Sequence, residues 1–317
     1  MRVLIAGALG HIGSGLIEHL LKNTDYTVYA IDNLKTQRYS TLLGLMPESN
    51  FFFTQQDLSS DDSDFSLENI DVVINLAALT DPEESFLEPE ATMNHNLSIV
   101  QKLAQKCALF DVPLIHISST SIFSGKNVVI CDANSIEHVR PHTPYAKSKW
   151  VEEKYIEKLG LSQNLQYCIL RFGTVYGFSL GMRFHTAINK FCWQVLTDQK
   201  VTVWKTALHQ IRPYLSLDDG VRAISFIIQN SLYTKTQFNV VSENLSIEDV
   251  LHRFEELNIS INISMIESKS MNDSSFTVNS DGILSHGFKP KGNLLSGISG
   301  IMSKFNILRP KDGKFDG

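Results

Sequence analysis

The chain has 317 residues, of which 43% are hydrophobic and 20% charged, and its formal net charge is −6. This length and composition are those of an ordinary globular protein with one large domain and a smaller one. The acidic balance excludes the basic field that nonspecific nucleic-acid binding requires, so we expect no nucleic-acid partner. No apolar run reaches membrane-spanning length, and the apolar start is too short for a secretory signal, so we predict no membrane association and a cytoplasmic location. The four cysteines lack metal-binding spacing, which predicts reduced thiols and no metal site.

Short apolar runs alternate with amphipathic stretches through the first half of the chain. The predicted strands are residues 2–6, 27–31, 50–54, 72–76, 113–118 and 166–171. The predicted helices are residues 12–22, 91–110 and 145–159. Alternating strands and helices of these lengths are typical of a parallel sheet with crossover helices. We therefore predict an α/β fold with a doubly wound parallel sheet.

The alternation becomes irregular after residue 177. Helices are predicted over residues 184–196 and 217–229, strands over 200–203 and 238–241, and Ser246 is predicted to cap a helix that runs to residue 256. We predict a first domain over residues 1–177, to which residues 205–245 partly return. A smaller, mainly substrate-binding α/β domain is predicted over residues 178–308, followed by a flexible tail over 309–317.

Three glycines follow the first predicted strand and open the first helix. They are Gly7, Gly10 and Gly13, with His11 and Ile12 between the last two. The first glycine permits a tight turn, the second lets the backbone approach a pyrophosphate, and the third lets the helix pack closely on the strand. The sequence thus predicts a dinucleotide-binding loop on a sheet of the Rossmann type.

Asp32 ends the second predicted strand, where a carboxylate accepts hydrogen bonds from both ribose hydroxyls of NAD. The next residues, Asn33 and Leu34, carry no positive charge for a 2′-phosphate, so we predict NAD as the cofactor. Lys35 and Arg38 follow closely and leave NADP as the alternative. The ends of the next two strands complete the predicted cofactor site with Asp57, Leu58, Leu76, Ala77 and Ala78.

Tyr145 and Lys149 lie four residues apart on the helix predicted after Pro144, and therefore on one face of it. The lysine charge favours the phenolate, so Tyr145 can act as a general base or acid toward a carbinol oxygen. Lys149 can also hold the ribose of the nicotinamide. Hydroxyl side chains at residues 118–121 follow the fifth strand and can bind the same substrate oxygen. The alternatives are a solvated helix face and strand-end hydroxyls that cap the backbone.

The motifs taken together resemble the extended short-chain dehydrogenase/reductases, the NAD-dependent epimerase/dehydratase family that includes UDP-galactose 4-epimerase. The segments that carry the resemblance are GALGHIG (7–13), DNL (32–34), DL (57–58), NLAA (75–78), HISSTSIFSG (116–125), YAKSK (145–149) and RFGTVYG (171–177). The resemblance implies that Thr120, Tyr145 and Lys149 are catalytic. It also implies that Ser118 lies in the cofactor site and that Asn96 supports Lys149 through its backbone or a water molecule.

The resemblance implies a nucleoside-diphosphate sugar as substrate. Arg212 matches an arginine that grips the nucleotide phosphates, which suits its fixed fork of donors. Thr174 stands where many relatives have an asparagine. With Thr80 and Arg183 these residues form the predicted substrate site, and His185 is either a further sugar or phosphate contact or a structural histidine.

Two positions after Thr120 bear on the reaction. Family 4,6-dehydratases carry an Asp-Glu pair there, and this chain has Ser121 and Ile122, so dehydration is disfavoured. The absence of a cysteine at Ile122 likewise gives no support for 3,5-epimerase/4-reductase chemistry. We predict an NAD-dependent 4-epimerase that works through a 4-keto sugar. The alternatives are a 4-ketosugar reductase or sugar dehydrogenase, and a noncatalytic NAD-sensing scaffold. Relatives imply a homodimer through a four-helix bundle of residues 91–110 and 145–159.

Overall fold

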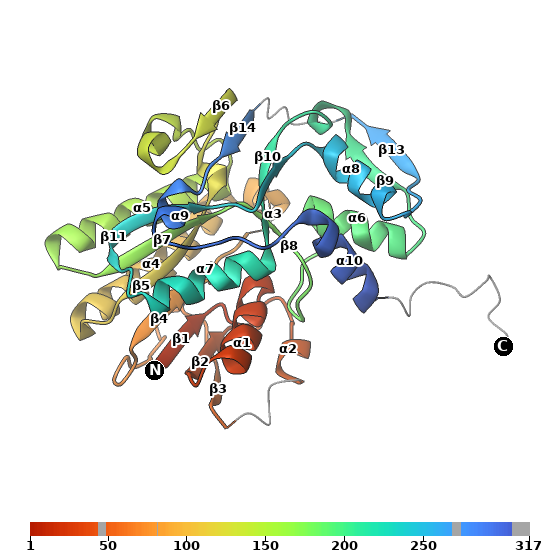
Figure 1. Cartoon of the computed structure of the whole chain (residues 1–317). Coiled ribbons are helices and arrows are strands. Elements are labelled where there is room, and N and C mark those ends of the chain that lie inside the picture. The colour runs from red at the N-terminus through yellow and green to blue at the C-terminus, as the bar shows by residue number, and fades with distance from the viewer. Residues whose placement is uncertain (44–48, 81, 268–273, 306–317) are drawn as a thin grey trace.

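The structure is a computed structural model that describes residues 1–43, 49–80, 82–267 and 274–305. Seven parallel strands form the main sheet (Figure 1). Their order is β11 (Thr234–Val240), β7 (Tyr167–Phe172), β5 (Leu114–Ser119), β4 (Val72–Asn75), β1 (Arg2–Ala6), β2 (Thr27–Asp32) and β3 (Phe51–Gln55). The order reverses direction between β1 and β4, which is where such sheets bind ligands. The predicted doubly wound α/β fold is confirmed.

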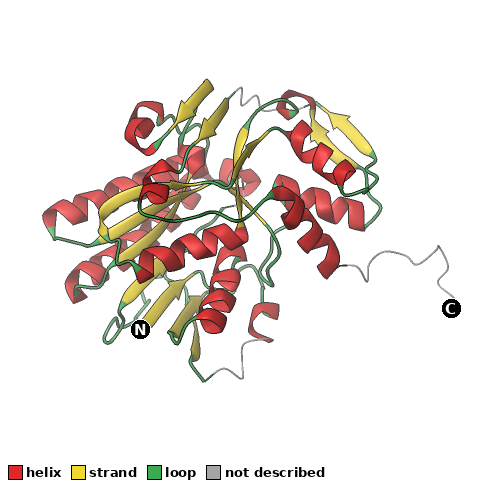
Figure 2. Cartoon of the chain, viewed as in Figure 1, coloured by secondary structure: helices red, strands yellow, loops and turns green. Residues whose placement is uncertain are grey.

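Helices cover both faces of this sheet (Figure 2). On one face, α1 (His11–Asn23) packs beside α7 (Leu217–Gln229) in a common apolar core with the strands. On the other face, α4 (Pro89–Phe110) packs against α5 (Pro144–Ser162) over a second core. Because both faces are buried, the strands are continuous apolar runs rather than alternating ones, which is what made them recognisable in the sequence.

The rest of the described chain contains three small sheets, three helices that share a core, and several short elements. The sheets are β12 (Glu243–Leu245), β10 (Arg212–Ser216) and β8 (Thr174–Tyr176); β13 (Ile263–Ile266) with β9 (Val201–Trp204); and β14 (Ser275–Val278) with β6 (Lys126–Ile130). Helices α6 (Ala187–Leu196), α8 (Ile247–Glu256) and α10 (Leu294–Lys304) share a third apolar core. The short elements are α2 (Ser40–Leu43), α3 (Pro82–Leu87), α9 (Asp281–Ser285) and the 3₁₀ turns Thr120–Ile122, Asp132–His138 and Lys205–Ala207.

Most predicted elements begin and end within a few residues of the observed ones. The helix predicted over residues 184–196 begins only at Ala187, because Thr186 is extended and occupies its N-cap position. The predicted cap at Ser246 is confirmed, and Asp249 completes a capping box with it. The short strands β6, β8, β10, β12, β13 and β14 were not predicted. The predicted tail, residues 309–317, lies outside the described residues.

Candidate active site

A cavity of about 490 Å³ opens at the carboxyl ends of β1, β2, β4 and β5. Residues from β8 and from the segment before α6 close its other side, so both parts of the molecule contribute to it. Most of the predicted site residues line this cavity: Gly7, Gly10, His11, Ile12, Gly13, Asp32, Asn33, Asp57, Leu58, Leu76, Ala77, Ala78, Thr80, Ser118, Tyr145, Lys149, Thr174 and Arg183. Three predicted site residues, Asn96, Thr120 and Arg212, are not in the lining.

The glycine loop requires glycine for steric reasons. Gly7 has a φ of +73°, and a Cβ there would lie 2.6 Å from the backbone nitrogen of Ala77. A Cβ on Gly13 would lie 2.4 Å from the carbonyl oxygen of Ala8. Gly10 is the N-cap of α1, and no side chain caps that end of the helix. The first-turn amides of α1 therefore face the cavity with the positive end of the helix dipole, which fits a pyrophosphate.

His11 joins the glycine loop to the second part of the molecule. Its ring is buried, and Nε2 lies 2.8 Å from the carbonyl oxygen of Gly177, to which it must donate because a carbonyl only accepts. Burial lowers the pKa of His11 to about 4, so the imidazole is neutral at physiological pH. The residue predicted as a cofactor contact thus also fixes the chain after β8 against the cofactor loop.

Asp32 is held rigidly at the end of β2. Its two carboxylate oxygens accept from the backbone amides of Leu9, at 3.0 Å, and Leu34, at 2.9 Å. Beside it, Asn33 donates to Asp57 at 3.1 Å. Burial alone would raise the pKa of Asp57, but the hydrogen bonds from Ser59 and Asn33 outweigh it and the pKa is lowered. The carboxylates of Asp32 and Asp57 are therefore fixed acceptors that could bind hydroxyl or amino groups of a dinucleotide.

Lys35 and Arg38 line the same side of the cavity as Asp32. Burial, and then the charge of Arg183, lower the pKa of Arg38. The alternative cofactor NADP was based on these two cations. Both basic residues line the cavity together with Asp32.

Tyr145 and Lys149 lie at the start of α5. Pro144 occupies the first turn and the hydroxyl of Thr143 accepts from the amide of Ala146 at 3.1 Å, so the helix begins sharply at the cavity. Both side chains line the cavity, and Nζ of Lys149 lies 6.0 Å from the centre of the Tyr145 ring. The structure thus places Tyr145, Lys149 and the glycine loop in one cavity.

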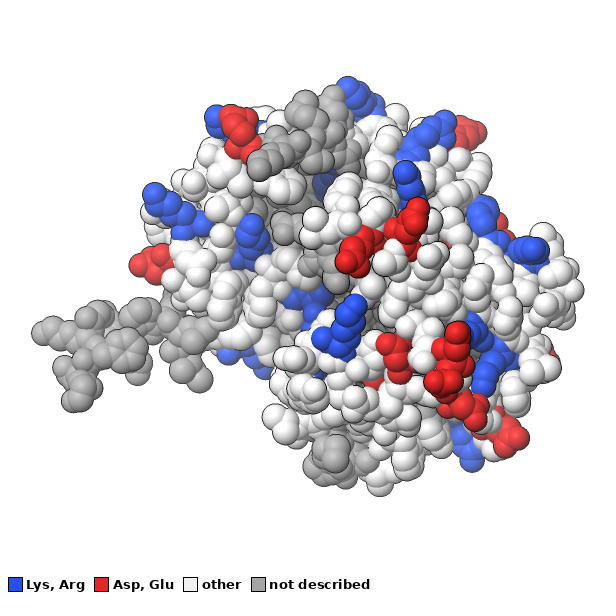
Figure 3. All heavy atoms as spheres, turned by 180° about the vertical axis from the view of Figure 1, so that it is seen from behind, with Lys and Arg blue, Asp and Glu red and all other residues white. Residues whose placement is uncertain are grey.

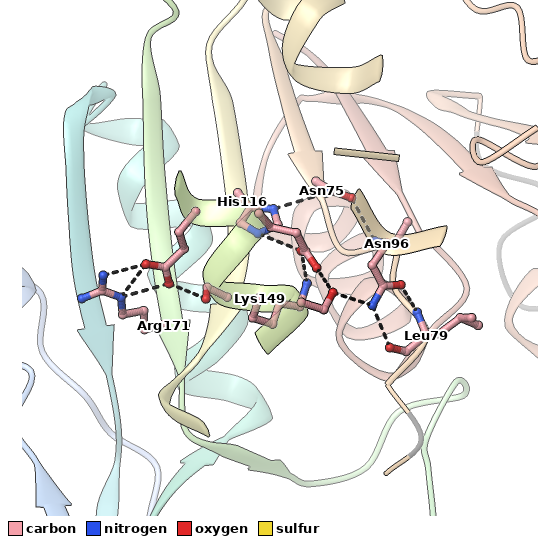
Figure 4. A network of polar contacts seen from close by, with 11 residues as sticks. Asn75, Leu79, Asn96, His116, Lys149 and Arg171 are labelled. Atoms are coloured by element: carbon pink, nitrogen blue, oxygen red, sulfur yellow. Dashed lines mark hydrogen bonds and ion pairs between the residues drawn. The ribbon is translucent and has the colours of Figure 1, made fainter. Parts of the chain in front are cut away.

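A chain of buried polar groups lies behind Lys149 (Figure 4). Nζ donates to Oε2 of Glu152 at 2.8 Å, and the Ser148 hydroxyl donates to Oε1 of the same carboxylate at 2.5 Å. Asn96 donates to Ser148 at 3.2 Å and holds both backbone groups of Leu79. Asn96 therefore reaches Lys149 through two side chains, Ser148 and Glu152. A route through backbone or water stays a prediction.

A second buried carboxylate on α5, that of Glu153, binds Arg171, which is labelled in Figure 4. It receives Nε and Nη2 of Arg171 on β7, with Nη2 at 2.6 Å, and it also accepts from the hydroxyl of Ser118. Arg171 further donates to Ser135 and Gln237. This cluster anchors α5 to the strand that carries Ser118 into the cavity.

Two predicted side chains have other partners. The hydroxyl of Thr120, 4% exposed, donates to the carbonyl of Phe172 at 3.2 Å, whereas Ser119 and Ser121 line the cavity. Arg212 donates to Gln210 and lies over the ring of Phe276. The motif positions of Thr120 and Arg212 were clear in the sequence, but the directions of their side chains depend on the neighbouring strands.

The remaining cavity contacts come from the second part of the chain and from α4. Arg183 donates to the hydroxyl of Thr80, which joins the two sides of the cavity. His185 lines the cavity with them, as does His95 from α4. No motif in the sequence marked His95 as a site residue.

A model of the NAD dependent epimerase/dehydratase family matches residues 3–240. The chain belongs to this family. The predicted cofactor, NAD, is confirmed for the family. A curated relative, the uncharacterized UDP-glucose epimerase YtcB of Bacillus subtilis, is 29% identical over 239 residues, which cover 72% of each chain.

Solved structures share the fold across nearly the whole chain. UDP-glucuronic acid 4-epimerase from Bacillus cereus, in complex with UDP-glucuronic acid and NAD, is 25% identical with a TM-score of 0.87, covering 97% of this chain and 100% of that one. A dTDP-glucose 4,6-dehydratase from Streptomyces venezuelae, with NAD and TYD bound, is 16% identical with a TM-score of 0.84, covering 98% and 99%. Epimerases and a dehydratase share the fold, so the reaction depends on the site residues.

Two further properties of the described residues bear on the sequence predictions. None of the described helices is both long enough and apolar enough to cross a membrane. The described part of the chain contains no group of three or more His, Cys, Asp or Glu side chains that could hold a metal ion. All four cysteines are free thiols, and three of them are buried.

Proposed function

We propose that the protein is an NAD-dependent 4-epimerase of a nucleoside-diphosphate sugar. The observation that carries this proposal is the shared cavity, in which Tyr145 and Lys149 face the glycine loop and Asp32. The names of the relatives support a sugar linked to UDP as the first substrate to test. Ser121 and Ile122 follow Thr120 where dehydration would need an acidic pair, which supports epimerisation over dehydration.

The cofactor would be held by the amides that follow Gly10, by Asp32 and by the small residues after β4. When bound, NAD⁺ supplies a hydride acceptor that later returns the hydride to the opposite face of the sugar. Tyr145 takes the proton of the 4-hydroxyl as the carbon is oxidised and gives it back in the second half. Lys149 holds the ribose and favours the phenolate form of Tyr145. No external reductant is consumed.

Acidic and basic side chains are interspersed over the face of the molecule shown in Figure 3. A phosphate-bearing substrate is therefore best held by local groups of the cavity. Arg183 and His185 line the cavity near His11 of the glycine loop, and we propose them for this role. Arg212 stays a proposed phosphate contact on the strength of its motif, and Thr174 and Thr80 stay proposed sugar contacts.

The proposal assigns the second hydroxyl contact to Thr120 because of its motif position. This role requires that its hydroxyl leaves the Phe172 carbonyl when substrate binds. Thr120→Val should then lower kcat by about 10-fold or more, whereas Ser121→Ala should change it little. The opposite pattern would assign the contact to Ser121, which lines the cavity.

The test of the function is a panel of UDP-, GDP-, CDP- and dTDP-linked sugars incubated with the purified protein and NAD⁺. Epimerised product without a net change in NADH absorbance is expected. Stoichiometric NAD(H) turnover would instead favour a 4-ketosugar reductase or a dehydrogenase.

Tyr145→Phe should lower kcat by about 10² to 10⁴. Tyr155→Phe on the same helix is the matched control, and its kcat should equal that of the wild type. The hydroxyl of Tyr155 accepts a hydrogen bond from Gln105. Equal turnover in Tyr145→Phe would favour a noncatalytic scaffold.

We also propose a homodimer through α4 and α5. Leu109, Val151 and Leu161 on these helices are 80%, 37% and 88% exposed, and exposed apolar side chains of this kind are common at interfaces. Sedimentation of the purified protein at the mass of a monomer, across micromolar concentrations, would contradict this.

A further inference from the structure

The polar chain behind Lys149 contains two groups that the proposed chemistry has not used. Glu152 on α5 and His116 on β5 are both 0% exposed. Oε2 of Glu152 lies 2.8 Å from Nζ of Lys149 and 3.3 Å from Nε2 of His116. A carboxylate is costly to bury unless it is paired, so its place directly behind a cavity lysine needs an explanation.

The hydrogen bond between Asn75 and His116 determines which nitrogen of the imidazole carries the proton (Figure 4). Oδ1 of Asn75 accepts from the amide of Ala77 at 3.1 Å, so Nδ2 of Asn75 faces His116. That nitrogen donates to Nδ1 of His116 at 3.2 Å. Neutral His116 therefore carries its proton on Nε2, which is directed toward the Glu152 carboxylate.

The charges of the three groups follow from their contacts. Burial alone would raise the pKa of Glu152, but Lys149 and His116 outweigh it and lower this pKa to about 2. Burial alone would lower the pKa of Lys149, but Glu152 outweighs it and the pKa is raised. Burial is the largest effect on His116 and lowers its pKa. The arrangement is an ammonium–carboxylate pair supported by a neutral imidazole.

Further titratable and neutral groups surround the pair formed by Lys149 and Glu152. Tyr145 and Glu153 are the further titratable groups on α5 that act on Lys149, and His116 is the titratable neighbour from β5. The contacts from α4 and β4 come from the neutral amides of Asn96 and Asn75. Glu152 is the one of these groups that directly contacts Nζ.

We propose that Glu152, supported by His116, is a positioning residue for Lys149: it fixes Nζ at the wall of the cavity and keeps the lysine in its ammonium form. This inference rests on the proposed function, because it is there that Lys149 holds the ribose and favours the phenolate of Tyr145. A charged lysine is required for both tasks. Without the carboxylate, burial would favour the neutral amine.

A purely structural role is the alternative, since the contact between Glu152 and His116 also joins α5 to β5. That role predicts a loss of stability in Glu152→Gln without any change in the titration of Lys149. The positioning role predicts that the titration midpoint of Lys149 falls, by about 1 to 3 pH units for the loss of one adjacent opposite charge. The two roles therefore differ in a measurement that does not depend on turnover.

The measurement is a ¹³C-NMR pH titration of protein labelled at lysine Cε, with the Lys149 signal assigned by Lys149→Arg. In the wild type this signal should not titrate below about pH 10.5, the ordinary lysine value. In Glu152→Gln the titration midpoint of Lys149 should fall below about pH 10.5. The pH at which kcat/KM declines on the alkaline side should also become lower, because Glu152 no longer raises the pKa of Lys149. An unchanged midpoint would overturn the inference.

Glu153→Gln is the matched control, because it removes a neighbouring, equally buried carboxylate whose partner is Arg171. It should lower stability but shift the Lys149 midpoint less than Glu152→Gln. If Glu152→Gln does not fold, Glu152→Asp keeps the charge at a greater distance, and a midpoint between those of the wild type and an unpaired lysine is expected. A midpoint in Glu152→Asp equal to that of the wild type would also contradict the role.

The inference and the proposed function fail in different ways. If no nucleotide sugar is converted but the Lys149 midpoint falls in Glu152→Gln, the proposed function is wrong and the role of Glu152 toward Lys149 stands. If a nucleotide sugar is epimerised and the midpoint is unchanged, the function stands and the inference is wrong.

Discussion

Replacing Arg171 by methionine should destabilise the protein far more than the loss of an ordinary surface charge. The Arg171 side chain is 2% exposed, and its guanidinium makes three hydrogen bonds to Glu153 and one each to Ser135 and Gln237. Methionine fills a similar volume but leaves the Glu153 carboxylate buried, with Ser118 as its remaining donor. Breaking a buried pair in this way costs about 3 to 5 kcal/mol.

The assay is equilibrium urea unfolding followed by circular dichroism. The double variant Glu153→Leu/Arg171→Met removes both charges and should recover much of the loss, because an apolar pair leaves no buried charge. Lys154→Met, which breaks a partly exposed pair with Glu157, is the control and should cost much less. A loss below about 1 kcal/mol in Arg171→Met, or a double variant as unstable as the sum of both single variants, would refute the reasoning.

Three further outcomes are expected. Gly13→Ala places a Cβ 2.4 Å from the carbonyl of Ala8 and should cost about 1 to 3 kcal/mol in urea unfolding, with weaker NAD binding by calorimetry, whereas Gly300→Ala meets open space and should not. Asp32→Asn should weaken NAD binding and reduce the preference over NADP; an unchanged ratio of the two Kd values would contradict the role of its charge. The pKa of Glu152, about 2, lies below its unfolded value near 4.3, so its stabilising effect is complete above that value and is lost as the pH falls toward 2. Stability measured across this range should depend less on pH in Glu152→Gln.

The features that the sequence predicted well depend on local spacing. Gly7, Gly10 and Gly13 follow one strand and open one helix, so their place at the end of β1 required no knowledge of distant contacts. The long apolar runs of the main sheet were equally recognisable. The strands β6, β8, β10, β12, β13 and β14 were missed because their three to five residues are interrupted by polar residues and do not form apolar runs like those of β1 and β4.

What the sequence by itself determined is the fold class, the cofactor loop and the placing of Tyr145 and Lys149 on one helix face, since each follows from residues close together in the chain. Only the tertiary structure decided what surrounds that pair. His116 and Glu152 belong to a strand and a helix far apart in sequence; Glu152 lies outside the quoted motifs, and the segment HISSTSIFSG gave His116 no role. The direction of the Thr120 hydroxyl likewise depends on β7, which supplies the Phe172 carbonyl. Side-chain partners of buried polar groups are set by which elements pack together, and that information is not local.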